Sequence, residues 1–461
     1  MGVEMAVVVA IALILWILPS LWWRLPQLTL VDMFLLGFVM FFGAYIVVDA
    51  ALHPYEYMDE LAIVVLFLPI IVTLLMLWVF ARRPSRLLRA TSLARFRDDW
   101  VATPTWAVVG LIAIGLLYTW SAAAFFGEYF TLEAHKLPEL ERNMPYWLTS
   151  IGILTNLTAF PGALCAWGKA RSSRGLAKVF WYAMLGVSAV VILGMGRRAV
   201  FALLVVVGWD IVSALRAKGR QAAAITMLVL SLPALVAISN VYQAYRLVSW
   251  RGVPLSNMVV GSDGHSLIET AAELNRTVEN LQDRSATWRF NYEVVKAHLD
   301  EKGELQLGRL FLFGIQNLVP SALYSGKETF DTEGELLRSF QLEDYDRAEN
   351  IFVATYGDFG MFNVVVAPVL VLLFVVVCAL VLRWLTDPFL RVLLLGSAIF
   401  YAINVEAAYH VPAGLARDFV VIALTYIAIR AFLRSVRRMV QAQIPTLRGD
   451  LASDDARIRA H

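Results

Sequence analysis

Residues 61–80 read LAIVVLFLPIIVTLLMLWVF, twenty consecutive residues without a charged side chain. A helix of about twenty apolar residues just crosses the hydrocarbon core of a bilayer, because each residue advances the helix by about 1.5 Å and the core is about 30 Å thick. This stretch therefore predicts a membrane-spanning helix.

Apolar runs of similar length recur along the whole chain. Of the 461 residues, 59% are hydrophobic and 16% are charged, whereas soluble domains have about 45–50% and about 25%. The sequence thus predicts an all-α polytopic membrane protein with about eleven transmembrane helices. Besides 61–80, the predicted spans are 3–22, 30–50, 104–126, 146–167, 179–195, 199–215, 222–241, 361–382, 390–409 and 415–433.

Basic residues collect in every second connection of this series. The connections after the third, fifth and seventh predicted spans, and the segment after the eleventh, are rich in Arg and Lys. Their basic residues are Arg82, Arg83, Arg86, Arg89, Arg95 and Arg97, then Lys169, Arg171, Arg174 and Lys178, then Arg216, Lys218 and Arg220, and last Arg430, Arg434, Arg437 and Arg438. Because short cytoplasmic loops carry such an excess, we expect the N-terminus outside and the C-terminus in the cytoplasm.

The predicted spans divide the chain into four parts. Residues 1–241 form an N-terminal bundle of about eight spans, 242–360 a large helical loop outside the membrane, 361–433 about three further spans, and 434–461 a cytoplasmic tail. Within the loop, 267–281 and 286–299 have helical spacing. Residues 309–323 are apolar but too short to span, which favours a helix that lies on or dips into the outer leaflet.

Two adjacent arginines stand between the sixth and seventh predicted spans. Arg197 and Arg198 follow Gly196 and fall on the outer side, against the general distribution of basic residues. Two guanidinium groups beside flexible glycine backbone are suited to binding phosphate. The alternative is that both side chains only reach for the membrane interface.

A second group of ionisable residues links the last two predicted spans. Glu406 and His410 are four residues apart and share a face if the helix continues. Either could act as a base, and Arg417 could bind an anion. The alternative is that Glu406 and Arg417 simply pair across the turn.

The large loop contributes further cations in an otherwise acidic region. It holds eleven Lys or Arg and eighteen Asp or Glu, so that Arg246, Arg289, Arg309 and Lys327 are candidate ligands for an anion. Arg289 stands beside Trp288 and Tyr292, a mixture that suits sugar stacking and equally suits a membrane interface. Solvation alone accounts for most arginines of this kind.

Several common motifs are absent from the sequence. It has no Walker A motif, no dinucleotide fingerprint, no HExxH and no GxSxG. Cys165 and Cys378 both lie in apolar runs, which does not indicate a disulfide framework or a metal site.

Three short stretches resemble bacterial polysaccharide repeat-unit polymerases of the O-antigen (Wzy) type, and more distantly the O-antigen ligases. Residues 196–199 read GRRA and look like the turn that opens a span in such proteins. Residues 318–327 read LVPSALYSGK and are similar to a Pro-x-x-Leu-x-x-x-Lys stretch of their large loop. Residues 350–360 read NIFVATYGDFG and look like their Asn-x(7)-Asp/Glu-x-Gly entry to a span.

The resemblance implies a metal-independent GT-C-type glycosyltransferase of the bacterial inner membrane, without a cofactor, whose active site faces the periplasm. It would polymerise undecaprenyl-pyrophosphate-linked oligosaccharides into a surface polysaccharide such as O-antigen, capsule or exopolysaccharide. The implied partners are the lipid-linked glycan, membrane lipid and a chain-length-regulating co-polymerase, without nucleic acid. The implied pyrophosphate ligands are Arg197, Arg198 and Arg417, then Arg289, Arg309, Lys327 and Arg246, and the implied bases are Glu406 and His410, then Asp358.

Three alternatives stay open at this point. A ligase typically has His before the Asn of the third stretch, whereas this chain has Glu349 before Asn350. A transporter or flippase of lipid-linked glycans often has inverted repeats, and no repeat is evident. A structural subunit of an export complex would leave the outward arginines unexplained.

Overall fold

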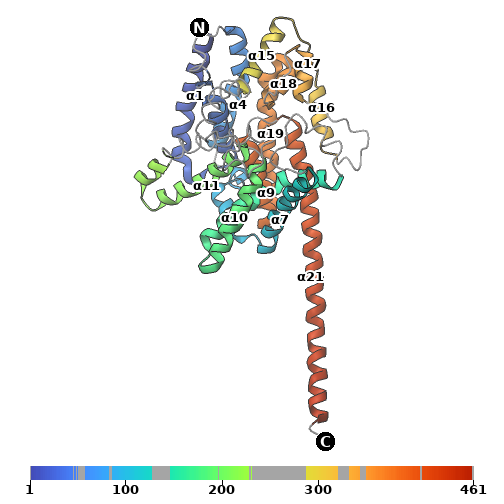
Figure 1. Ribbon diagram of the computed structural model, residues 1–461. Coiled ribbons are helices and arrows are strands. Elements are labelled where there is room, and N and C mark those ends of the chain that lie inside the picture. The colour runs from blue at the N-terminus through green and yellow to red at the C-terminus, as the bar shows by residue number, and fades with distance from the viewer. Residues whose placement is uncertain are drawn as a thin grey trace, which may run out of the picture.

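The protein is a bundle of long helices with a smaller group of short helices at one end (Figure 1). In the computed structural model, the described residues are 2–44, 46–47, 49, 58–82, 86–126, 146–195, 197–227, 230, 287–319, 332–342, 349–404 and 408–458. No β-strand lies among these residues, although Thr29 and Ser92 form an isolated antiparallel bridge. For the part of the chain described, the all-α prediction is confirmed.

Six helical segments in these ranges are long and apolar enough to cross a membrane. They belong to α1 (Gly2–Arg24), α4 (Glu60–Arg82), α10 (Gly175–Met195), α11 (Arg197–Ala217), α18 (Ile351–Phe359) continued by α19 (Asn363–Trp384), and α21 (His410–Ile458). The number rises to seven if α6 (Leu93–Ala102) and α7 (Thr105–Phe126), which meet at a bend of 97°, form one span. The prediction of a helical membrane protein is confirmed, whereas the number eleven and the orientation stay predictions.

The long helices are apolar on their buried and exposed faces alike. On α4, Ile63 and Leu66 are buried in the core, while Leu61 and Val64 are exposed on the outside of the bundle. A helix that is hydrophobic all round is stable only inside a large core or in lipid. The exposed apolar side chains of α4 therefore mark a lipid-facing surface.

One connection that the sequence analysis took as a basic loop contains a helix. α6 packs against α9 (Tyr146–Ser172) and α20 (Pro388–Ile403), and its residues Leu93, Phe96 and Trp100 are fully buried. These residues recur at intervals of three and four, which places them on one face. The helices α5 (Arg86–Arg89) and α6 and the first turn of α20 together form what we call the anchor end.

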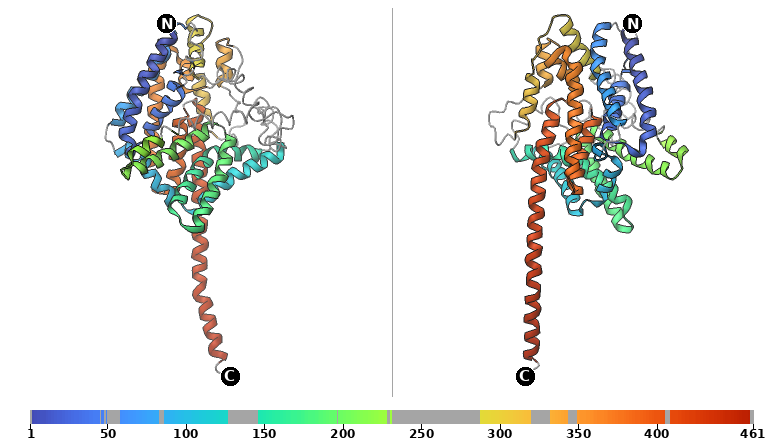
Figure 2. Two further views of the ribbon diagram at one scale, coloured as in Figure 1. Left: turned by 60° about the vertical axis from the view of Figure 1, so that its left-hand side comes forward. Right: turned by 180° about the vertical axis from the view of Figure 1, so that it is seen from behind.

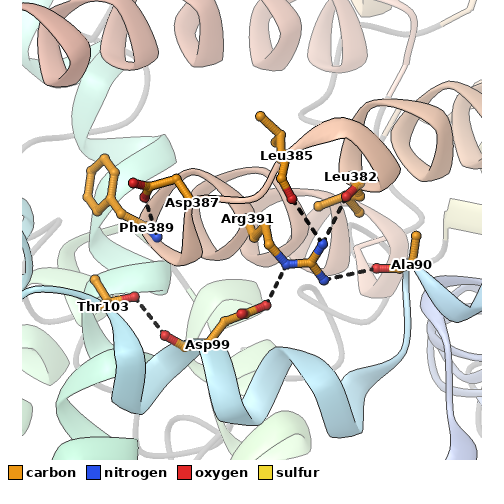
Figure 3. Close-up of polar contacts among 8 residues, drawn as sticks. All are labelled: Ala90, Asp99, Thr103, Leu382, Leu385, Asp387, Phe389 and Arg391. Carbon is orange, nitrogen blue, oxygen red and sulfur yellow. Dashed lines mark hydrogen bonds and ion pairs between the residues drawn. The ribbon is translucent and has the colours of Figure 1, made fainter.

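A buried arginine holds the anchor end together (Figure 3). The Nε of Arg391, in the first turn of α20, donates to an Asp99 carboxylate oxygen at 2.8 Å. Its Nη1 donates to the carbonyl oxygens of Leu382 and Leu385 at 2.8 and 3.4 Å, and its Nη2 to that of Ala90 at 3.4 Å. Arg391 thus ties α6 and the end of α19 to α20.

Four short helices form a lobe at the opposite end. The lobe consists of α15 (Thr287–Leu299), α16 (Arg309–Gln316), α17 (Thr332–Ser339) and α18, and α18 leads through a short turn into α19. Figures 1 and 2 place the start of α1 at the lobe and the end of α21 far beyond the other end. Because α19 has 22 residues and runs for about 33 Å, the lobe and the anchor end are separated by its full length.

Several boundaries differ from the predicted ones. α15 confirms the helix predicted for 286–299, but α16 ends at Gln316, and α20 has only 16 residues where a span over 390–409 was expected. α21 does not end near residue 433 but continues as one helix into the predicted tail, to Ile458 (Figure 2). Residues 267–281 and most of the predicted span 222–241 lie outside the described ranges.

Candidate functional site

The helix α16 packs against both α18 and α21, and α18 holds its beginning. Its N-cap is Gly308, a glycine with φ of 89° and no side chain to accept from the first turn. The fully buried carboxylate of Asp358 on α18 takes this role, since it accepts the backbone N–H groups of Leu310 at 3.0 Å and Phe311 at 2.8 Å. A carboxylate at a helix N-terminus satisfies free N–H groups and interacts favourably with the helix dipole.

The other end of α16 packs tightly against the start of α21. A Cβ atom on Gly314 would lie 2.4 Å from the Cβ of Tyr409, so only glycine fits at this contact. The ring of Phe311 meets the Tyr409 ring edge to face, with the centroids 5.5 Å apart. The position of α21 relative to the lobe is therefore fixed at the residues that precede Arg417.

Arg417 lies at this junction and is largely buried, with 14% of its side chain exposed. Its Nε donates to a carboxylate oxygen of Asp418 at 2.7 Å, and its Nη1 donates to the carbonyl oxygen of Asn317 at 3.2 Å. Asn317 is the C-cap of α16, where carbonyl groups lack helical partners. A guanidinium group has five N–H donors, and no acceptor among the described residues contacts the Nη2 of Arg417.

The packing of α16 brings together three stretches that are distant in sequence. Residues 350–360 and 408–418 both contact residues 309–319, which contain α16. Residues 318–319 and 350–360 belong to stretches that resemble repeat-unit polymerases. Residues 408–418 contain Arg417. Arg417 and Asp358 therefore belong to one site, which we call the α16 junction.

Arg289 lies elsewhere in the lobe and is engaged in an ion pair. Its Nε donates to the carboxylate of Asp49 at 2.7 Å, and 16% of the Arg289 side chain and 7% of the Asp49 side chain are exposed. Nearby, the backbone N–H of Asp59 donates to the Tyr292 hydroxyl at 2.9 Å. These contacts fasten α15 to the segment between α2 (Leu30–Phe38) and α4, so Arg289 has a structural role in this conformation.

Arg309 and a pair of asparagines make further polar contacts in the lobe. Arg309 is about half exposed, and its Nη1 lies 3.7 Å from a carboxylate oxygen of Glu335 on α17. Asn291 on α15 and Asn350 before α18 exchange side-chain hydrogen bonds of 2.8 and 3.4 Å. The Asn350 side chain also accepts the N–H groups of Phe352 and Val353, so it caps α18.

The other candidate residues are described in part or not at all. Glu406, Lys327 and Arg246 lie outside the described residues. For Arg197, Arg198 and His410 only the backbone is described: Arg197 and Arg198 open α11, and His410 opens α21 immediately after Tyr409. Their roles stay predictions.

The partners that hold the lobe together lie far apart in the sequence. Asp49 and Arg289 are 240 residues apart, and Asn291 and Asn350 are 59 residues apart. No local spacing rule connects residues at such separations. Gly308 before an apolar helical run indicates a helix that lacks a side-chain cap of its own. No local pattern indicates that Asp358, about 50 residues away, supplies this cap.

Comparison of the chain with protein-family models, with curated proteins and with solved structures finds no match. The arrangement itself defines what the site can do. A guanidinium group whose Nη2 has no acceptor among the described residues, within a candidate membrane-spanning helix, can bind a phosphate oxygen through charge-assisted hydrogen bonds.

Proposed function

We propose that the protein is a membrane glycosyltransferase that joins lipid-linked oligosaccharide repeat units into a polysaccharide at the lobe end of the bundle. The observation that carries this proposal is Arg417: its Nε and Nη1 hold it at the α16 junction, while its Nη2 has no acceptor among the described residues. The resemblance of residues 196–199, 318–327 and 350–360 to repeat-unit polymerases supports the same reaction class.

The substrate of such an enzyme would be an oligosaccharide on undecaprenyl pyrophosphate. As the bond between the sugar and the pyrophosphate breaks, negative charge grows on the departing phosphate oxygen. Donors fixed in advance at this position stabilise the transition state, and we assign this role to Arg417. Arg197 and Arg198 are proposed to bind the same group.

A base must remove the proton of the acceptor hydroxyl group. Glu406 and His410 remain the proposed candidates, because His410 directly precedes the turns of α21 that carry Arg417. Asp358 is the weaker candidate, since each of its carboxylate oxygens already accepts a backbone N–H group.

The placement of the enzyme follows from the predicted topology. The basic connections would face the cytoplasm, so the lobe would face the periplasm of a bacterial inner membrane. A chain-length-regulating co-polymerase would then act on the same side.

The direct test uses the purified full-length protein in vesicles with lipid-linked repeat units. We expect a ladder of products that differ by one repeat, and we expect Arg417→Ala, Arg197→Ala and Arg198→Ala to abolish the long products. Arg434→Ala is the matched control, because Arg434 lies on the same helix, exposed, and about 25 Å farther along.

The same assay separates the alternatives. Movement of the lipid-linked glycan across the bilayer without chain growth would identify a carrier, and transfer to a different acceptor would identify a ligase. Full-length ladders from all three arginine variants would contradict the assignment of the site.

A further inference from the structure

The outer face of α16 and the turn that directly follows it, with Leu318 and Val319, are apolar and exposed. Leu312, Ile315, Leu318 and Val319 have exposed fractions of 61, 43, 45 and 41%, whereas Leu310 and Gly314 on the opposite face are buried against α18 and Tyr409. Residues 310–319 read LFLFGIQNLV and contain no charged side chain.

A second helix of the lobe shows what a water-facing surface looks like in this protein. α17 also has eight residues, TEGELLRS, and it buries Leu336 and Leu337. Its remaining positions include Glu333, Glu335 and Arg338. Each helix thus buries an apolar face, but the exposed side chain on α17 is the charged Arg338, at 73%, whereas the exposed side chains of Leu312 and Ile315 on α16 are apolar.

The contacts with α21 fix the depth of α16. The segment Val411–Val436 of α21 is apolar and long enough to cross the membrane. The bond from Arg417 to the carbonyl oxygen of Asn317 places the end of α16 beside the second turn of that segment. Figure 1 agrees, since α16 lies next to the upper end of α21. The C-terminal half of α16 is therefore level with the entry of α21 into the bilayer.

We propose that the exposed face of α16 is inserted in the leaflet on the lobe side, where the acyl chains of the bilayer cover it. Exposure of an apolar, uncharged face of this kind to water is unfavourable. At the depth of the C-terminal half of α16, the phase around the bundle is lipid. This inference does not depend on the reaction proposed above.

Spin labels on single cysteines test the insertion in the full-length protein reconstituted in lipid nanodiscs. Cys165 and Cys378 are both buried, and the parent variant Cys165→Ala/Cys378→Ala is first checked for an unchanged melting temperature. Labels replace Leu312, Ile315 and Val319 in turn. Reference labels replace Lys302, which is 67% exposed on a polar connection, and Val365, which is 59% exposed on α19.

We expect the labels at Leu312, Ile315 and Val319 to be accessible to oxygen and protected from a water-soluble nickel relaxant, as at Val365. The label at Lys302 should give the reverse ratio. Nickel accessibility at Leu312 and Ile315 equal to that at Lys302 would overturn the proposal. Labels protected from both relaxants would also overturn it, because a protein segment would then cover the face.

Discussion

Arg391 and Arg417 belong to consecutive helices, and each lies next to an aspartate, yet their surroundings differ. Arg391 at the anchor end has 2% of its side chain exposed, and all three of its nitrogen atoms donate to acceptors on α6, α19 and the Ala90 turn. Arg417 at the lobe end has two such contacts, and among the described residues its Nη2 has none.

This difference separates two uses of the same side chain. A buried guanidinium group whose donors are all satisfied joins segments and has no capacity left for a ligand. A guanidinium group held by two contacts is positioned in advance and keeps donors for an anion. We therefore expect the two arginines to respond oppositely when stability and activity are measured together.

The largest expected effect is a loss of folding stability when Arg391 is replaced. Arg391→Met leaves Asp99, whose side chain is 15% exposed, without its partner. Loss of one member of a fully buried pair costs about 3–5 kcal/mol, which is the upper bound for this partly exposed pair. We expect a lower midpoint in denaturant unfolding of the detergent-solubilised protein, and partial recovery in Arg391→Met/Asp99→Asn because the uncompensated charge is gone. A single variant as stable as the wild type would mean that the pair does not hold the anchor end.

The next effect concerns the contact that places Arg417. Gly314→Ala puts a methyl group into the backbone and side chain of Tyr409, and overpacking of this kind typically costs about 1–3 kcal/mol. We expect both the unfolding midpoint and chain extension to fall. Gly186→Ala is the matched control, since a Cβ there meets nothing within 4 Å; equal behaviour of the two variants would contradict the tight contact.

A smaller effect distinguishes a cap from a base at Asp358. Asp358→Ala removes the acceptors for two N–H groups of α16, and the loss of a helix cap costs about 0.5–2 kcal/mol. Asp358→Asn keeps an acceptor oxygen, so we expect it to retain most stability and chain extension. If Asp358→Asn folds normally and is inactive, the carboxylate is a base and our structural assignment is wrong.

The smallest effect is expected at Arg309. Arg309 is about half exposed and lies 3.7 Å from Glu335, and such surface pairs contribute about 0–1 kcal/mol. Arg309→Ala should leave the melting temperature and the product ladder unchanged. If Arg309→Ala loses the product ladder but keeps the wild-type melting temperature, then Arg309 contacts the substrate and the substrate site extends from α16 to α17.

The sequence was sufficient for features that repeat locally. Runs of about twenty apolar residues predicted α1, α4 and α19, and helical spacing predicted α15, because these patterns depend only on near neighbours. The helix α6 was missed since Phe96 and Trp100 stand among basic residues that suggested a loop. The five-residue π-helical turn Val39–Gly43 inside the second predicted span had no local signal either.

The site was harder to predict because its contacts are not local. The three residues at 197, 198 and 417 were chosen for their type and side of the membrane, and of these only the Arg417 side chain is described. Its real partners are its neighbour Asp418 and the carbonyl of Asn317, 100 residues away. The suggested pairing of Glu406 with Arg417 involves a residue outside the described ranges and stays a prediction.

The most direct test compares Arg417→Lys with Arg434→Lys in the vesicle assay, with the melting temperature of each recorded. Lysine keeps the charge but not the planar fork of donors. Loss of a hydrogen bond to a charged group costs about 1.5–3 kcal/mol, which corresponds to about a 10- to 100-fold lower rate. We predict that fall for Arg417→Lys at an unchanged melting temperature, and no change for Arg434→Lys. A wild-type rate in Arg417→Lys, or a loss of stability like that of Arg391→Met, would contradict the claim that Arg417 is an anion-binding residue.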